Sequence, residues 1–476
     1  MRLLPGIIVL VSLACTAPQT PATTAAATAP QAEPRYVVGL LPLQVTSPEA
    51  APYAPLQEQR IQTALQELAA NTPMTVVFPL NTRPLTSMEE ARTRAAAAKV
   101  NTLVWGTVSA EGEKVIVKLS SYESTVDANS SFWAMEYSTL DPKADEQFEL
   151  DALRIAQAIM QDSLLPMMMR DQPSNVRVML EALVSKAPHD WVDWNQDIIR
   201  RRWGMLGRLL RDGALTEKGY RGALADVAAW RANHEATPST NVKEAFYSVG
   251  LARGFLLQGK PQAAVETLEP IVKRMPEDVE SRLLLARAHL AMGDTTQAPV
   301  LLQPLVDEGK NPAATRMYVA ALAPTNSGKE QVDTALSRLT EKNPDDVMAA
   351  LLRYLTAPGA ARVEELKAFT SAHASADWPL PVARYFTGAL NEQALWAATK
   401  DEDSHMERIH RIQVHYYLGE AALAGRLPGH EGHPDQRAAQ QHFEAAIATH
   451  AFHHPTYDLA DFQLEQLHRG HVASGR

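Results

Sequence analysis

The sequence lacks several features on which common classes of protein depend. It has one cysteine among 476 residues, which excludes an intramolecular disulfide and any cysteine-rich zinc or iron–sulfur site. Basic residues are outnumbered, with 45 Lys and Arg against 55 Asp and Glu, and a net charge of −10 argues against nucleic acid as the main partner. Aromatic residues make up only 6% of the chain, but the 46% apolar content is typical of a folded protein. The length predicts more than one domain.

The single cysteine follows a short apolar segment at the start of the chain. Arg2 precedes the run LLPGIIVLVSLA at 3–14, in which Ala14 stands directly before Cys15. A basic residue, a short apolar run and a small residue at the junction are typical of a secretory signal peptide. The junction resembles the lipobox of bacterial lipoproteins, which implies that Cys15 carries the acyl chains of a stable membrane anchor. The alternative is an ordinary cleaved signal followed by a chance cysteine.

The next two segments predict a tether and a small mixed α/β domain. Residues 15–34 are almost entirely Thr, Ala, Pro and Gln after the cysteine, and they predict a disordered tether. Within 35–165, apolar or alternating runs predict strands and apolar residues at helical spacing predict helices. The expected strands are 36–43, 74–79, 103–108, 114–122 and 132–137, and the expected helices are 56–71, 87–99 and 146–164.

Part of this domain resembles a known family of envelope domains. The segment AAAAKVNTLVWGTVSAEGEKVIVKLSSYES at 95–124 is similar to the pattern of TolB amino-terminal-like domains. The resemblance implies a binding or assembly module without catalytic chemistry. It also implies a bend in the strand at Gly106.

Helical repeats dominate the rest of the chain. Residues 245–278 and 279–312 match at a constant offset of 34 residues, which is the period of the tetratricopeptide repeat (TPR). The matched pairs include Gly259 with Gly293 and Ala264 with Ala298, small residues that allow two helices to turn and cross closely. A further repeat is predicted at 412–454. The fold class is therefore α+β and multidomain: a small mixed α/β-sheet domain followed by an all-α TPR solenoid over 173–476.

The C-terminal part resembles the NlpI-type TPR lipoproteins. The residues that carry this resemblance are WPLP at 378–381, VHYYLGEAALAG at 414–425, HFEAAIATH at 442–450 and YDLADFQLEQL at 457–467. This chain departs from the family pattern at a histidine-rich loop and at Gln413. The resemblance implies a bacterial, membrane-anchored scaffold that brings envelope proteins together and is not itself an enzyme.

Two arginines one period apart predict a groove for protein partners. Arg253 and Arg287 occupy the same position of the first helix in consecutive repeats, on the face that lines the concave side of a TPR solenoid. Arginine pairs bidentately with carboxylates, which favours an acidic segment as partner. We expect alanine at both positions to weaken partner capture with little loss of fold. A surface ladder neutralised by neighbouring glutamates is the alternative. The predicted groove residues are Phe246, Val249, Arg253, Leu256, Glu280, Leu283, Arg287 and Leu290.

Histidine is the other residue type with an uneven distribution. Eleven of the 15 histidines follow residue 400, so a metal site or a response to pH is conceivable, with a solvated surface as the alternative. His430 and His433 are weak candidates for a metal site, and no cofactor is predicted.

Taken together, the sequence predicts a lipid-anchored cell-envelope scaffold that binds proteins, with its folded part in the periplasm of a bacterium and no enzymatic activity. The alternative is a periplasmic enzyme subunit or a small-ligand sensor whose site lies in the α/β domain.

Overall fold

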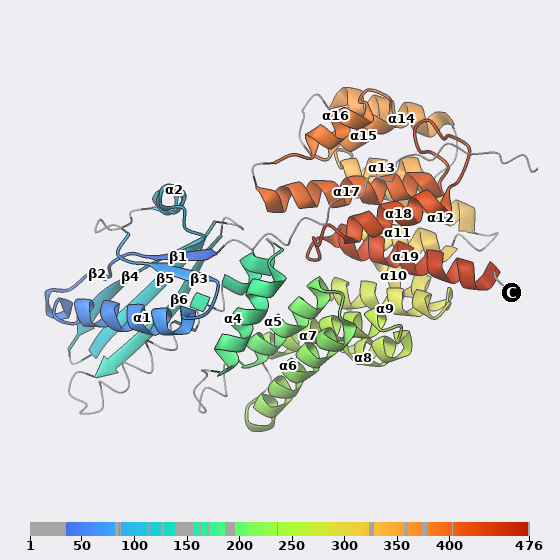
Figure 1. The fold of residues 1–476 in the computed structure, drawn as a ribbon. Coiled ribbons are helices and arrows are strands. Elements are labelled where there is room, and N and C mark those ends of the chain that lie inside the picture. Colours follow the sequence, from blue (N-terminus) through green and yellow to red (C-terminus); the bar gives the residue numbers. More distant parts are fainter. Residues whose placement is uncertain are drawn as a thin grey trace, which may run out of the picture. The chain divides into compact units, whose positions relative to one another are not determined.

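The computed structural model describes residues 35–474 except 81–84, 86, 113, 125–127, 139–151, 153–155, 158, 161–162, 169–170, 186–195, 236, 323–327, 357–359, 374–377 and 402. The predicted signal peptide, Cys15 and the tether at 15–34 lie outside the described residues. The predicted fold class is confirmed, because a small mixed sheet precedes a long series of helices (Figure 1). None of the helices described is both long and apolar enough to cross a membrane.

The N-terminal sheet has the strand order β3-β1-β4-β5-β6, and β2 pairs with β4 beside this path. Strands β3, β1 and β4 are parallel, whereas β4, β5 and β6 form an antiparallel meander. The expected strands at 103–108 and 114–122 lie in β4 and β5, which pair from Thr102 with Glu123 to Glu111 with Lys114. The elements are β1 (Tyr36–Leu40), β2 (Gln44–Val45), a 3-10 turn (Pro48–Ala50), α1 (Ala54–Ala69), β3 (Met74–Val77), α2 (Met88–Ala98), β4 (Thr102–Glu111), β5 (Lys114–Glu123) and β6 (Ala128–Ser138).

The alternation of buried side chains along the strands explains how two helices cover this sheet. Val104 and Val108 of β4 pack in the cluster that contains Leu65 of α1, whereas Leu103 packs with Ala91 of α2. Since successive strand residues point to opposite faces, α1 and α2 lie on opposite sides of the sheet. At Gly106, where a bend in the strand is expected, the structure shows a close contact with the neighbouring strand. A Cβ atom there would collide with the Lys118 carbonyl of β5 and lie 2.5 Å from a methyl group of Leu119, so the glycine permits close strand contact.

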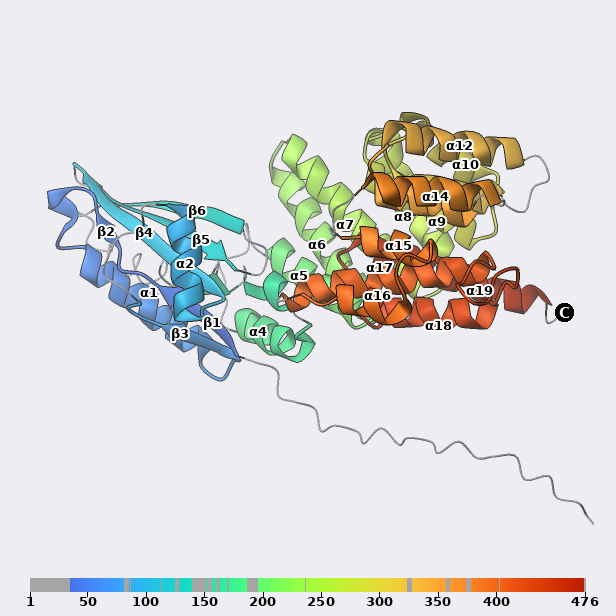
Figure 2. The same ribbon diagram turned by 90° about the horizontal axis from the view of Figure 1, so that it is seen from above.

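The second part of the chain is a series of helices in antiparallel hairpins (Figure 2). The helices are α4 (Pro173–Ser185), α5 (Gln196–Leu209), α6 (Gly213–Asn233), α7 (Pro238–Leu257), α8 (Pro261–Arg274), α9 (Val279–Ala291), α10 (Gln297–Glu308), α11 (Pro312–Leu322), α12 (Gly328–Lys342), α13 (Val347–Thr356), α14 (Ala360–Ala372), α15 (Leu380–Phe386), α16 (Glu392–Ala398), α17 (Ser404–Leu423), α18 (Gln436–Ile447) and α19 (Pro455–Ser474).

The two clearest predicted repeats form the hairpins α7–α8 and α9–α10. Gly259 and Gly293 follow the first helix of each hairpin with φ of 69° and 80°, a left-handed conformation that glycine adopts without strain. Ala264 and Ala298, one period apart on the second helices, are completely buried. The structure therefore confirms that the 34-residue offset aligns turn glycines and helix contacts.

The repeat predicted at 412–454 is the hairpin α17–α18. Gly419 of α17 faces the ring of Phe443 of α18, and a Cβ atom at position 419 would lie 2.6 Å from that ring. A side chain at 419 would therefore force the two helices apart. The following helix, α19, packs on both α17 and α18 and ends the described chain.

Candidate functional site: an arginine ladder on the first helices of the repeats

Four successive hairpins each contribute one arginine from their first helix. Consecutive first helices α5, α7, α9 and α11 contact one another, and they carry Arg208, Arg253, Arg287 and Arg316 in that order. We call these four side chains the arginine ladder. The sequence analysis predicted the two middle members. It missed the outer two because they stand 45 residues before Arg253 and 29 residues after Arg287, so the 34-residue period does not reach them.

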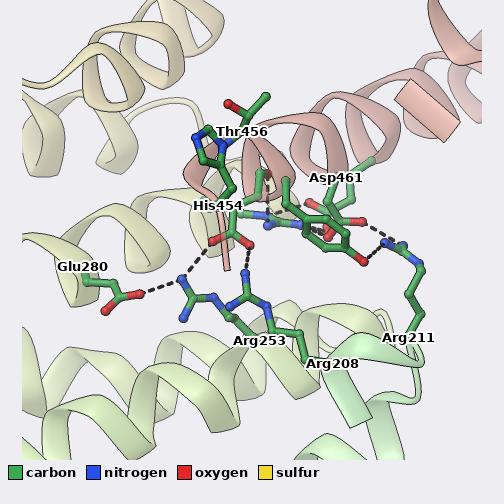
Figure 3. A network of polar contacts seen from close by, with 11 residues as sticks. Arg208, Arg211, Arg253, Glu280, His454, Thr456 and Asp461 are labelled. Atoms are coloured by element: carbon green, nitrogen blue, oxygen red, sulfur yellow. Dashed lines mark hydrogen bonds and ion pairs between the residues drawn. The ribbon is translucent and has the colours of Figure 1, made fainter. Parts of the chain in front are cut away.

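The carboxylates that pair with the ladder come mainly from the last helix of the same chain. Asp458, Asp461 and Glu465 of α19 lie at positions i, i+3 and i+7, which places them on one side of the helix. We call this the acidic face of α19. Figure 3 shows the side chains of Arg208, Arg211 and Arg253 pointing toward α19.

Asp458 joins the first two members of the ladder. Its Oδ1 accepts a hydrogen bond from Arg208 Nη2 at 2.6 Å, and its Oδ2 accepts one from Arg253 Nη2 at 2.9 Å. Arg253 also pairs at 2.7 Å with Glu280, whose side chain is 49% exposed (Figure 3). The Nε of Arg253 is buried and has no hydrogen-bond partner. Arg253 also lines a small cavity with residues of α19. The cavity is lined by Arg208, Arg253, Leu256, Leu257, Arg287, Tyr457, Asp458 and Asp461.

Arg287 is the most buried member, with a side chain that is 3% exposed. Its Nη2 donates to Asp461 Oδ2 at 2.6 Å and to Glu465 Oε1 at 2.5 Å, and its Nε donates to Glu465 Oε2 at 3.3 Å. Arg211, in the turn after α5, donates to the other carboxylate oxygen of Asp461 at 2.7 Å. Every carboxylate of the acidic face is thus held by at least one guanidinium.

Arg316 extends the ladder to a different helix of the same C-terminal region. It pairs bidentately with Glu420 of α17, at 3.0 Å from Nε and 2.8 Å from Nη2. Gln463 of α19 donates a further hydrogen bond to Glu420 at 2.8 Å. The bidentate geometry fixes the relative orientation of the two side chains in addition to pairing their charges.

The ionisation of these groups follows from burial and pairing. Burial alone would raise the pKa of Asp458, but Arg208, Arg253 and Arg287 together hold it well below its usual range. The pKa of Asp461 is lowered in the same way, because Arg287 and Arg211 outweigh its burial. Burial dominates at Glu465 and raises its pKa despite Arg287. The contacts between the arginines and the acidic face of α19, which we call the seam, are therefore charge-assisted hydrogen bonds near neutral pH.

The predicted groove residues divide into accessible residues, buried apolar residues and the two arginines. Phe246 and Glu280 are exposed and Leu283 is half-buried, so these are accessible. Val249, Leu256 and Leu290 are buried among the helices and present no surface to a partner in this conformation.

The two predicted arginines stand on one face, as expected, but that face is covered by α19. Because Arg287 is buried against two carboxylates, we now expect the double alanine change to destabilise the fold as well as the binding face. Both arginines are neutralised, yet the carboxylates belong mainly to a distant helix rather than to neighbouring glutamates.

The C-terminal histidines occupy two kinds of environment. His430 and His433 lie exposed in the loop between α17 and α18. Within the residues described, no group of three or more His, Cys, Asp or Glu side chains could hold a metal ion. Others are half-buried: partial burial, with repulsion from His405, lowers the pKa of His453 to about 3 and that of His454 to about 4. These two precede α19 directly, so neutral imidazoles pack where the helix begins.

Comparison with known proteins identifies the repeats. The family model of the tetratricopeptide repeat matches residues 255–322, from the end of α7 to the end of α11. No curated protein matches the chain. The match includes Arg287 and Arg316, and it overlaps both repeats that the 34-residue offset predicted. Together with the paired helices, turn glycines and buried alanines, it shows that the chain contains tetratricopeptide repeats.

Proposed function

We propose that the chain is a membrane-anchored cell-envelope lipoprotein that acts as a non-enzymatic scaffold or adaptor for protein partners. The observation that carries this proposal is the TPR solenoid, because stacked repeats form extended concave surfaces that generally bind proteins. The series of arginines on its first helices suits a partner with acidic segments. Crosslinking in native membranes, followed by identification of the crosslinked proteins, tests the scaffold role. Recovery of the chain without specific partners would contradict it.

The membrane anchor is the second component of this proposal. Support comes from the sequence, in which an apolar run ends at the only cysteine and a Pro- and Thr-rich tether follows. We expect Cys15→Ser to abolish acylation and to move the protein out of the membrane fraction. The matched control is Thr20→Ala in the tether, which leaves the cysteine in place. If Cys15→Ser sediments with membranes as the wild type does, Cys15 is not the anchor.

The assignment of a periplasmic location rests on the same N-terminal residues and on the resemblance to NlpI-type lipoproteins. The α/β domain, where an enzyme or sensor site was the alternative, has a shallow depression at the end of α1 beside β3. Among the residues that line this depression, only Arg35 carries a charge, so it offers no acid–base pair. This lining gives no support to an enzyme site in the depression.

A further inference from the structure

The acidic face of α19 has the chemistry that the ladder selects in a partner. Its carboxylates at i, i+3 and i+7 meet guanidiniums from α5, the α5–α6 turn, α7 and α9 at 2.5–2.9 Å. These contacts join residues between 174 and 250 positions apart in the sequence. The solenoid thus already holds a helical ligand on its arginine face, and that ligand is its own last helix.

Two different surfaces hold α19 in place. Its backbone packs closely on α18 and α17, the elements that precede it in the chain. On the side of the early repeats, Arg208 of α5 and Arg253 of α7 reach Asp458 through their side chains (Figure 3), and α9 also contacts α19. A helix that presents the same carboxylates would keep each guanidinium paired, so an exchange avoids the large penalty of a buried unpaired charge. The released acidic face of α19 would be hydrated.

We propose that Arg208, Arg253 and Arg287 of the arginine ladder, together with Arg211, form the docking surface for an acidic helix of a protein partner, and that α19 covers them in cis until such a helix competes. The partner helix carries carboxylates at i, i+3 and i+7, in the pattern of α19. This inference rests on the proposed function as a protein scaffold. It deepens that function by naming the surface, the chemistry of the partner and the contact that regulates access.

A tethered ligand is a strong competitor, because its effective concentration is on the order of millimolar. A free acidic helix should therefore bind the wild-type chain weakly and bind better once α19 is weakened. The probe is a fluorescent synthetic peptide with the sequence of residues 452–474, and binding to the full-length chain is measured by anisotropy. We expect the variant Asp458→Asn/Glu465→Gln to bind this peptide at least tenfold more tightly than the wild type. The matched control is Glu444→Gln, an exposed carboxylate on α18, which should bind as the wild type does.

A second arm uses the unaltered protein, so the proposal does not depend on the folding of a variant. Saturating peptide should accelerate amide hydrogen exchange in α19 of the wild type and leave α2 unchanged. A peptide with amides in place of the carboxylates at 458, 461 and 465 should bind at least tenfold more weakly. Equal affinity of the two peptides, equal affinity of variant and wild type, or unchanged exchange in α19 would each overturn the inference.

The outcomes separate this inference from the scaffold proposal. If the peptide arms fail while membrane crosslinking still captures specific proteins, the ladder is not the docking surface and the scaffold proposal stands. If the peptide displaces α19 as expected, the docking inference is supported, and absence of crosslinked partners would then count against the scaffold alone.

Discussion

Replacing Arg287 by alanine tests the energetic importance of the seam between α9 and α19. The side chain is 3% exposed and holds Asp461 and Glu465 at 2.5–2.6 Å. Removing one partner of a buried ion pair typically costs about 3–5 kcal/mol, because the other partner stays buried without compensation. Two features reduce the loss here: Asp461 keeps Arg211 at 2.7 Å, and Glu465, whose pKa is already raised, can take up a proton. We therefore expect a loss near the lower limit, about 3 kcal/mol of unfolding free energy.

The assay is urea unfolding at neutral pH, followed by circular dichroism at a helical wavelength. Arg221→Ala is the matched control, because this arginine is 60% exposed and pairs with Glu217 one turn away on α6. An exposed pair of this kind contributes under about 1 kcal/mol. In a double-mutant cycle, Arg287→Ala and Glu465→Gln should show a coupling energy of about 1–3 kcal/mol, since the side chains are in direct contact. A loss for Arg287→Ala no larger than for Arg221→Ala would refute the reasoning.

Three further predictions concern the repeats and the histidines. Ala264→Leu should lower the unfolding free energy by about 1–3 kcal/mol, because the completely buried position has no room for a larger side chain, and the exposed change Gln262→Leu on the same helix should not; equal melting curves would mean that the contact is misplaced. Because burial lowers the pKa of His453 to about 3, only the unfolded chain takes up its proton near pH 6.5. Stability from this group should be complete above pH 6.5 and decline toward acid, by up to about 1.4 kcal/mol per pH unit. In urea unfolding across about pH 7.5–4.5, which includes the upper part of the range between the two pKa values, His453→Phe should flatten this decline, whereas exposed His433→Gln should leave it unchanged; an equal slope in both variants would contradict the assignment. If the loop between α17 and α18 binds Zn or Ni, the joint replacement of His430 and His433 by glutamine should reduce metal retention, measured by equilibrium dialysis, and unchanged retention would exclude this site.

The sequence was sufficient to predict the repeats that follow local rules. The 34-residue offset located α7–α10 because turn glycines and small contact residues, such as Ala264 and Ala298, are required at fixed places in each hairpin. The same rules placed Arg253 and Arg287 on one face. In the α/β domain, the alternation of apolar residues predicted the strands, whereas the order of strands in the sheet came only from the structure.

The partner of the predicted arginines could not be found by the same reasoning. Whether α19 reaches α7 and α9 depends on the accumulated rotation of all the hairpins between them, and no local pattern specifies that sum. One signal was present in the sequence: Asp458, Asp461 and Glu465 recur at helical spacing on the last helix. Such spacing shows that three carboxylates share a face, but not which helix they meet. Arg208 and Arg316 do not follow the 34-residue period, because the hairpins that carry them differ in length from the two central repeats.

The contact between α19 and the early repeats changes how the chain can fold. In an open array each repeat depends only on its neighbours, and folding can proceed from one end as the chain is made. Here Asp458 completes the environment of Arg208, 250 residues earlier, so the first hairpins cannot reach their final state before the last helix emerges. Contacts of such long sequence separation slow folding and make distant segments unfold together. A nick or truncation within the last 20 residues should therefore loosen helices that lie near the middle of the sequence.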